Sequence, residues 1–500
     1  MSALRVYFRV VWGRKNVRAD GFTAAGCGGS GVRATAVAAV LLAATAAGAS
    51  ADTLPWALAQ AYKNNPQINS QRASVRATDE SVPQALSGYR PRVSLTATAG
   101  EQYLDNSTRS VTTSPSTGQV TGVTYPHADG ANATQTYGGT FTQPVLNGFQ
   151  TANRTRQAEQ LVSAARETLR NTEQNVLLAA ATAYMNLIRD AAILELRRRN
   201  VEVLQEQLRQ TRDRFTVGEV TRTDVAQAEN RLAGARADVL TAESNYLTSR
   251  SAYRQVIGVE PGTLAPASPV DRLSPRTLQQ GIIEARLRHP AVTTAMFNID
   301  AAEFQVKIAE GALYPTFNIV GNAQQSYGSA SSLNALQTFV ASVGGQLSIP
   351  VYQGGTEYAT IRQAKETLGQ RRIDLDTARD QAQQTWVQWW GTLDAAKAQI
   401  QATQTQVTAA EIALNGVREE ARVGQRTTLD VLNAQQELVN ARVSLVTAQR
   451  DRVVASYTLL AAAGRLSPQA LHLDVPIYDP VVHYHQVRDS WGGVRTPDGK

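Results

Sequence analysis

Apolar residues recur at steps of three, four and seven between Gly148 and Gly218, in a stretch without glycine or proline. This spacing places side chains on one face of an α-helix. At a rise of about 1.5 Å per residue, the pattern predicts one continuous helix of about 100 Å. A second long helix is predicted over 357–422, although three internal glycines each weaken it by up to about 1 kcal/mol.

Shorter helical patterns flank the first long helix, over about 54–87 and 219–257. Each would reach about 50 to 60 Å at the same rise per residue. Two such helices placed end to end match the length of one long helix. We therefore expect a wall of near-parallel helices whose alanine-rich seams allow close packing.

Four further segments alternate between apolar side chains and polar or small ones, which is the two-residue period of a β-strand. They begin near Val93, Tyr137, Phe317 and Phe339. Each is about ten residues long, which suits a tilted strand that spans a membrane and equally suits a strand of a soluble sandwich. In the membrane interpretation, the polar stretches 105–134 and 328–334 are loops on the outside of the cell.

The order of these elements repeats along the chain. A shift of 206 positions places Pro144 on Pro350, and the same shift aligns the Val-Gly pairs at 217–218 and 423–424. Self-similarity of this kind indicates two copies of one structural unit. The predicted domains are a first repeat at 52–258, a linker at 259–277, a second repeat at 278–464, and a C-terminal periplasmic tail at 465–500.

The strand count bears on assembly. After Asp52, no stretch approaches the run of about 20 apolar residues that a membrane-spanning helix needs, so a membrane form would have to use the strands. Four strands cannot close a membrane barrel, because the smallest have about eight and open edges cannot face lipid. Several chains would then each contribute four strands to a common barrel.

The first 51 residues have the layout of a secretory signal peptide. Arg33 precedes the small, apolar run 34–47, and a small-x-small site ends at Ala51, where cleavage is expected. This segment holds six cations and one acid, a net +5, so the formal net charge of +7 falls to +2 for the remainder. A near-neutral body argues against a nucleic-acid partner.

The sequence offers little for catalysis or metal binding. It contains no Ser/His/Asp grouping, phosphate-binding glycine loop or paired carboxylates in a pocket-like context, so no enzyme activity, catalytic residue or cofactor is expected. His483 and His485 have no third ligand nearby, and we expect no metal site. The tryptophans at 386, 389 and 390 share one helical face and are expected to pack in a belt of short helices around a tunnel.

Several segments together resemble a known family. They are RFTVGEVTRTDVAQAENRL (214–232), its echo ARVGQRTTLDVLNAQQEL (421–438), the strand exits PVLNG and PVYQGG, and the turns NNP and RHP. In order and with their twofold repeat, they resemble the TolC outer-membrane channel-tunnel family. The C-terminal run 478–500 further resembles its alphaproteobacterial branch of type I secretion outer-membrane proteins.

This resemblance implies a mixed α and β membrane protein with a long antiparallel coiled-coil barrel of helices. It also implies a homotrimer, in which four strands per chain form a twelve-stranded transmembrane β-barrel above a periplasmic tunnel of twelve helices. The expected location is the cell outer membrane with a long periplasmic extension. The tunnel is expected to be closed at its tip and opened by an adaptor protein and an inner-membrane ABC, RND or MFS pump.

The helix tips carry the candidate gate. The predicted tip turns are Val217-Gly218 and Val423-Gly424. By position, the resemblance assigns the closing hydrogen bonds and salt bridges to Thr223, Asp224 and Arg426, and an acidic ring facing the pore to Asp430. Bonds of about 1 to 3 kcal/mol each could hold a narrow ring shut and still be broken by a partner.

The same acids have a simpler interpretation. Thr221-x-x-Asp224 and Thr427-x-x-Asp430 both fit the capping pattern of a helix start, where an acid also meets the positive end of the helix dipole. Capping does not exclude gating. The chain departs from the family pattern at Ala421, where an aromatic partner is expected, and at Asn433, which replaces an acid of the ring.

Two functions remain open on the sequence. The first is a passive outer-membrane exit duct of a tripartite efflux or type I secretion system, which exports proteins or small molecules and is gated at the periplasmic helix tips. The second is a periplasmic coiled-coil structural or adaptor protein without a membrane barrel. The residues name neither the cargo nor the pump.

Overall fold

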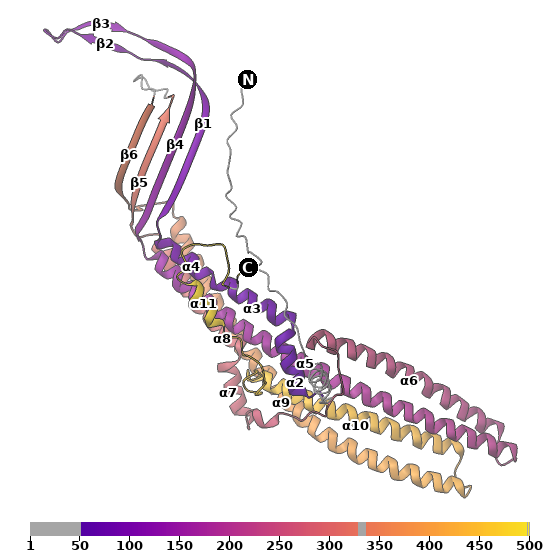
Figure 1. Ribbon diagram of the computed structural model, residues 1–500. Helices are drawn as coiled ribbons and strands as arrows, with labels where there is room; N and C mark the ends of the chain where they lie inside the picture. Colours follow the sequence, from indigo (N-terminus) through magenta and orange to yellow (C-terminus); the bar gives the residue numbers. More distant parts are fainter. Residues whose placement is uncertain (1–51, 329–336, 498, 500) are drawn as a thin grey trace, which may run out of the picture. The chain divides into compact units, whose positions relative to one another are not determined.

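The computed structural model describes residues 52–328, 337–497 and 499 (Figure 1). The predicted signal peptide and most of the predicted loop 328–334 lie outside the described residues. The helices are α2 (Leu54–Asn64), α3 (Pro66–Asp79), α4 (Ser81–Leu86), η1 (Ser87–Tyr89), α5 (Gln150–Thr216), α6 (Arg222–Ile257), η2 (Asp271–Leu273), α7 (Leu278–Arg288), α8 (Pro290–Gly311), α9 (Thr356–Arg422), α10 (Thr428–Ala462) and α11 (Pro480–Val487). The strands are β1 (Arg92–Ser107), β2 (Ser110–Thr113), β3 (Val120–Thr124), β4 (His127–Asn147), β5 (Thr316–Tyr327) and β6 (Gln337–Ser348).

The two long helices, α5 and α9, each contain 67 residues and confirm the prediction to within two residues at either end. Left-handed backbone precedes both of them. Gly355 has φ +87° before α9, and at the equivalent position before α5 it is Phe149 that has φ +60°. The glycines inside α9 do not interrupt it, since a cost of about 1 kcal/mol each is small beside the packing of so long a helix.

The predicted single helix over 54–87 is wrong, because the structure divides it into α2, α3, α4 and η1. Proline is the main reason, since the residue before a proline is driven out of helical backbone. Asn65 is extended at ψ 126°, and its Oδ1 caps the next helix by accepting a hydrogen bond from the Gln67 backbone N–H at 2.8 Å. His289 plays the same part before Pro290, where α7 gives way to α8.

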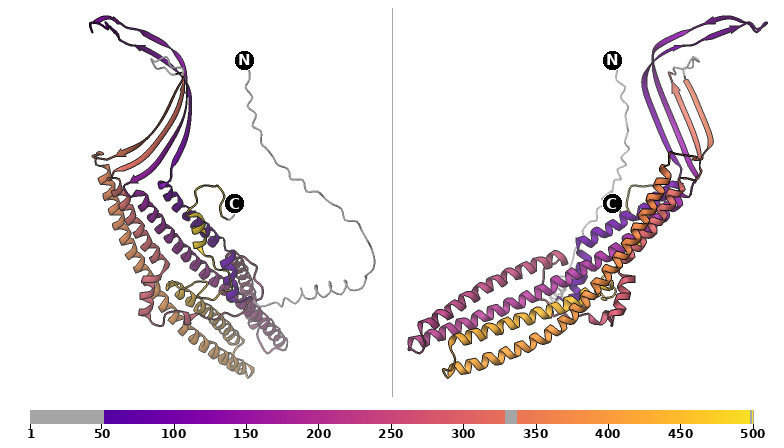
Figure 2. Two further views of the ribbon diagram at one scale, coloured as in Figure 1. Left: turned by 60° about the vertical axis from the view of Figure 1, so that its left-hand side comes forward. Right: turned by 180° about the vertical axis from the view of Figure 1, so that it is seen from behind.

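The shorter helices pack along the long ones, as the predicted wall requires. α6 packs on α5 and α10 on α9, while α3 and α8 pack along α5, and α7 and α8 pack along α9. Figure 2 shows α6 and α10 beside the parts of α5 and α9 that lead to the tips. At about 1.5 Å per residue, each long helix separates its tip from the strands by about 100 Å.

The main sheet is antiparallel and has four strands in the order β1-β4-β5-β6. Its register places Val93 opposite Phe141, Phe141 opposite Gly321, and Gly321 opposite Val343, so one row of apolar and small residues crosses all four strands. The central pair joins β4 of the first repeat to β5 of the second. β1 and β6 are therefore the two edges.

The predicted loop 105–134 is largely wrong. β1 continues to Ser107, β4 already begins at His127, and β2 and β3 pair as a hairpin between them. The residues of this hairpin are mostly exposed on both faces, so the sequence there lacks the alternation that marks a half-buried strand.

The largest core cluster surrounds the middle of α5, where α2, α6, α10, the linker and the C-terminal segment meet. Tyr184 is fully buried there, and its hydroxyl donates to the backbone oxygens of Asp52 and Ala265, at 2.7 and 2.6 Å. Among the described helices, α5 is the one that is long and apolar enough to cross a membrane by length and composition alone. Its most apolar 18 residues have a mean hydropathy of 1.3, and half of them are buried inside the protein. Packing in this core accounts for its apolar character.

The predicted packing against short helices is confirmed at Trp386, which is fully buried in a second core cluster against the short helix α7, while the belt around a tunnel stays a prediction. Its Nε1 donates to the Leu278 backbone oxygen at 3.0 Å. The indole fits against Gly281, where an added Cβ would come within 1.9 Å of the ring. Trp389 and Trp390 are partly buried and pack on the same cluster.

Candidate functional site at the helix tips

The two tips have the same backbone turn. At the first, Gly218 has φ +83°, and the Glu219 N–H donates to the Arg214 carbonyl at 3.0 Å. At the second, Gly424 has φ +77°, and the Gln425 N–H donates to the Glu420 carbonyl at 2.9 Å. An added Cβ would meet nothing within 4 Å at either glycine, so backbone conformation alone requires glycine there.

Both tips expose a valine before the glycine. Val217 is 75% exposed and Val423 is 71% exposed. Each valine directly follows a long helix and directly precedes the left-handed glycine of the tip, and its side chain is exposed to solvent there. Each tip therefore presents an apolar side chain to whatever lies beyond it.

The capping prediction is confirmed at both tips. The Asp224 N–H donates to Thr221 Oγ1 at 3.3 Å, and Asp224 Oδ2 accepts from the Thr221 N–H at 2.9 Å. The corresponding distances between Asp430 and Thr427 are 3.2 and 3.0 Å. These bonds, the backbone one first, hold the pKa of Asp430 below its usual range, so this acid is ionised at neutral pH.

Each tip also has an ion pair across its turn, with the charges exchanged. Arg214 Nε lies 2.7 Å from Glu219 Oε2 at the first tip, and Arg426 Nε lies 2.8 Å from Glu420 Oε2 at the second. The 206-residue shift aligns Arg214 with Glu420, so opposite charges occupy equivalent positions. The hydrogen bond to Glu420 raises the pKa of Arg426.

The structure thus groups the candidate gate residues in two places, with Thr223 and Asp224 at the start of α6 and Arg426 and Asp430 around the start of α10. Thr223 is exposed, and within the part of the chain that the structure describes its hydroxyl makes no hydrogen bond. None of these four side chains bonds to the opposite tip within the described ranges. Their role in gating stays a prediction.

Other residues link the two helical hairpins near the tips, and the sequence reasoning missed this role. Arg231 Nη2 of α6 donates to Asn433 Oδ1 of α10 at 2.7 Å. Leu432 is 2% exposed and packs in a cluster with Leu204, Leu208 and helix α6. Asn433, which the sequence marked only as a departure from an acidic ring, is therefore a hydrogen-bond acceptor between the hairpins.

The sequence did contain a signal for the partner of Arg426. Glu420 lies one helical turn before the predicted tip, and its repeat equivalent is the arginine of the other ion pair. A comparison of charges between the repeats finds this exchange at one position only, because the shift places Glu219 on Gln425 and Arg426 on Val220. For Arg231 and Asn433, which are 202 positions apart, no local pattern is available.

The tip ion pairs are exposed, with side-chain exposures between 46% and 59% for the four partners. Exposed pairs contribute about 0 to 1 kcal/mol each. Across the described residues, no group of three or more His, Cys, Asp or Glu side chains is placed to hold a metal ion. What the tips offer is therefore a set of weak, reversible polar contacts.

Comparisons with known proteins agree on one family. A family model described as "Outer membrane efflux protein" matches residues 57–259 and 281–465. The chain is 41% identical over 466 residues to the outer membrane efflux protein BepC of Brucella suis biovar 1, covering 93% of this chain and 97% of the relative. It is 27% identical to the outer membrane protein TolC of Vibrio cholerae, covering 82% of this chain and 90% of that protein.

A solved structure shows the same fold. The outer membrane protein VceC of Vibrio cholerae matches with a TM-score of 0.65 at 20% identity, covering 82% of this chain and 96% of VceC. The similarity extends over helices and strands together. It agrees with the expected combination of a helical barrel and a transmembrane β-barrel.

Proposed function

The chain belongs to the outer membrane efflux protein family and is an outer-membrane exit duct for efflux or type I secretion. From that premise we propose that three copies form one duct and that the helix tips gate it. The protein resides in the outer membrane, and its helices extend into the periplasm. The alternative of a periplasmic rod or adaptor without a membrane barrel is thereby excluded.

The four-stranded sheet supports assembly from several copies. Within the described residues, β1 and β6 each pair on one side only, so both edges offer free backbone donors and acceptors. Such edges cannot face lipid, and four strands are about half of the smallest membrane barrel. Edge-to-edge pairing of three copies gives the twelve strands that the family resemblance implies.

The outer face of the sheet suits contact with lipid. Leu95 is 85% exposed, Val93 is 70% exposed and Val343 is 83% exposed, and the register places these residues on one face. Exposed apolar side chains in this number would be unfavourable in water.

Native mass spectrometry of the purified protein in detergent tests the assembly. The expected result is a species with three times the mass of the mature chain. A monomer or dimer that retains membrane insertion would contradict the proposed barrel. Cross-linking of cysteines introduced into β1 and β6 would then report whether those edges meet between copies.

The gate proposal rests on one observation, the ion pair between Arg426 and Glu420 at an exposed tip. Its partners are on either side of a fixed turn, so the Arg426 guanidinium is held at the end of the hairpin beside Asp430. Threefold symmetry repeats each contact, so contacts of about 1 kcal/mol or less add up around the ring. The unbonded hydroxyl of Thr223 is available to a neighbouring copy.

Opening would move one hairpin relative to the other. In the protomer, the hydrogen bond from Arg231 to Asn433 and the packing of Leu432 hold α6 near α10 at the tips. We infer that a bound adaptor displaces the tip contacts first, because they are exposed and cost little to break. The buried Leu432 then limits how far the hairpins separate.

Single-channel conductance in planar bilayers tests the gate. Arg426→Ser removes the charge at the second tip, and we expect conductance of the isolated duct to rise several-fold. Arg422→Ser is the matched control, because Arg422 is also exposed near this tip and pairs with Glu419 at 3.0 Å within one helix. Equal conductance of wild type and Arg426→Ser would remove this residue from the gate.

Partners and cargo follow from the same premise. We propose that an adaptor and an inner-membrane ABC, RND or MFS pump supply the energy, and that the duct itself passes proteins or small molecules without catalysis. The family to which the chain belongs is described as outer membrane efflux proteins. Co-purification of the affinity-tagged duct from its native envelope would test this, since recovery of no adaptor after cross-linking contradicts the tripartite assignment.

A further inference from the structure

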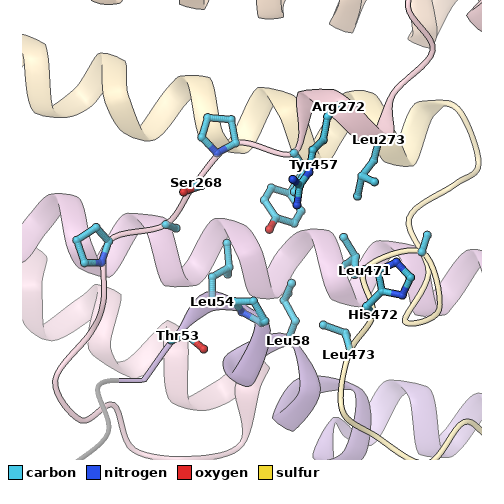
Figure 3. Close-up of a pocket in the computed structure, with 16 residues that line it drawn as sticks. Thr53, Leu54, Leu58, Ser268, Arg272, Leu273, Tyr457, Leu471, His472 and Leu473 are labelled. Carbon is cyan, nitrogen blue, oxygen red and sulfur yellow. The ribbon is translucent and has the colours of Figure 1, made fainter.

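A cavity of about 640 Å³ lies beside α2, away from the helix tips (Figure 3). Its walls come from the start of α2, from the linker segment 266–273, from the loop 470–473, and from Tyr457 of α10. Ligand pockets for small molecules commonly have volumes of about 300 to 1,000 Å³. The proposed duct function assigns no role to this cavity.

The walls are fixed by hydrogen bonds that do not involve the cavity. In the linker, the Val270 N–H donates to the fully buried Ser456 Oγ at 3.1 Å. In the C-terminal loop, the Leu473 N–H donates to the Pro468 carbonyl at 3.0 Å. The two loops that border the cavity are therefore held in place, and the cavity is preformed.

The interior is mainly apolar. Leu54 and Leu58 of α2 are 2% and 1% exposed, and Leu473 is 9% exposed. Figure 3 shows these side chains gathered on the side of the cavity formed by α2 and the C-terminal loop. A ligand would therefore place an apolar body here.

One polar group that lines the cavity, the Tyr457 hydroxyl, can bond to a ligand. Tyr457 is only 4% exposed, lines the cavity, and its hydroxyl makes no hydrogen bond within the part of the chain that the structure describes. Burial raises the pKa of Tyr457 to about 12, so the hydroxyl stays protonated and can donate. Because this hydroxyl has no hydrogen bond to the described part of the protein, it is available to an acceptor in the cavity.

Two nitrogen-bearing side chains, Arg272 and His472, line the same cavity, and both residues are exposed. Neither side chain makes a hydrogen bond or ion pair within the described ranges, whereas the neighbouring Asp271 already lies 3.6 Å from Arg452. His472 has φ +49°, a conformation that non-glycine residues rarely adopt. Among the described residues that line the cavity, none is acidic.

We propose that this cavity binds a small amphipathic carboxylate whose apolar body carries a hydrogen-bond acceptor. The carboxylate pairs with Arg272 and accepts from His472, since guanidinium and carboxylate form paired, charge-assisted hydrogen bonds. The apolar body covers Val270, Leu273 and Leu471, lining residues that are only partly buried. Its acceptor, a hydroxyl or carbonyl oxygen, accepts a hydrogen bond from the Tyr457 hydroxyl.

Equilibrium dialysis of radiolabelled 12-hydroxydodecanoate against the full duct in lipid nanodiscs tests the site, with empty nanodiscs as the reference. We expect Arg272→Gln to weaken binding by about tenfold or more. Arg276→Gln is the matched control, because Arg276 is an exposed arginine nearby that does not line the cavity. Leu471→Trp should abolish binding by filling the cavity.

Two further comparisons separate the parts of the proposal. The hydroxylated acid should bind several-fold more tightly than dodecanoate to wild type, and Tyr457→Phe should remove that difference without unfolding the protein. Binding no greater than to empty nanodiscs, equal binding to wild type and Arg272→Gln, or equal affinity for dodecylamine would each overturn the proposal. Binding is measured without transport, so such a failure leaves the duct assignment intact.

Discussion

The Nδ1 atom of His483 lies 2.9 Å from the Oδ2 atom of Asp79, and both residues are buried. This contact joins α11 to α3 across 404 positions of sequence. Arg166 of α5 lies 3.9 Å from the same carboxylate and 5.2 Å from the ring of Tyr484. The C-terminal segment is therefore fastened to the helices of the first repeat.

We predict that His483→Ala releases this segment. The change leaves the fully buried Asp79 without its closest partner, at a cost of about 3 kcal/mol. Limited proteolysis followed by mass spectrometry should show faster cleavage near α11. His485→Ala is the control, because His485 is exposed, and equal cleavage in both variants would contradict the prediction.

The pH dependence of stability should involve Glu173. Burial raises the pKa of Glu173 above its ordinary value of 4.5, although Arg72 and the Tyr62 hydroxyl oppose the shift. The folded protein then binds more protons than the unfolded one between pH 4.5 and the raised value, so the free energy of unfolding falls as pH rises through that window.

Glu173→Gln should remove this contribution. Thermal unfolding of wild type and variant from pH 4 to 8 would measure it, and we expect the difference in melting temperature between the two proteins to change across the window. Glu419→Gln serves as a control, since Glu419 is an exposed acid. Parallel pH curves for wild type and Glu173→Gln would refute the assignment.

The tip turns require glycine for conformational reasons alone. Gly218→Ala and Gly424→Ala should each cost about 1 to 2 kcal/mol, because left-handed backbone is unfavourable for residues with a Cβ. Hydrogen exchange at the adjoining helix ends should become faster. Gly234→Ala, inside α6 with open space around it, should instead stabilise by up to about 1 kcal/mol.

The contact between Trp386 and Gly281 should be strongly coupled. Trp386→Ala is expected to cost about 3 to 5 kcal/mol through the cavity it leaves. Gly281→Ala should cost about 1 to 3 kcal/mol, since the new Cβ would overlap the indole. Denaturant unfolding of the double variant Gly281→Ala/Trp386→Ala should show less than the sum of the single effects.

Gly391→Ala is the control for the effect of adding a Cβ in a helix. Gly391→Ala lies in the same long helix as Trp386, with nothing within 4 Å of the added Cβ. It should stabilise the helix by up to about 1 kcal/mol. Additive costs in the double variant would mean that the indole and Gly281 do not constrain each other.

The long helices and their turns could be predicted because their signals are local. Gly218 and Gly424 end long helical patterns, and the Thr-x-x-Asp sequences start the next helices with caps that the structure confirms. The break at Pro66 was equally local, but the helical periodicity on both sides concealed it. The NNP sequence should have been given more weight than the pattern around it.

The remainder depended on contacts between distant residues. Strands β2 and β3 have no buried face, so their valines and threonines give no pattern distinct from a polar loop. The pairing of Arg231 with Asn433 and the cavity beside Tyr457 arise only where separate segments meet. The helix caps could therefore be located from the sequence, whereas the contacts between the two helical hairpins could not.

The exchanged ion pairs at the two tips have a consequence for docking. At the first tip the positive Arg214 precedes the turn and the negative Glu219 follows it. At the second tip the order is reversed, because the negative Glu420 precedes the turn and the positive Arg426 follows it. A ring of three copies would present six hairpin ends of alternating polarity. A partner built from identical subunits that covers the whole ring must therefore bind two kinds of hairpin end with opposite charge order. Alternatively, each of its subunits must contact one hairpin end of each kind.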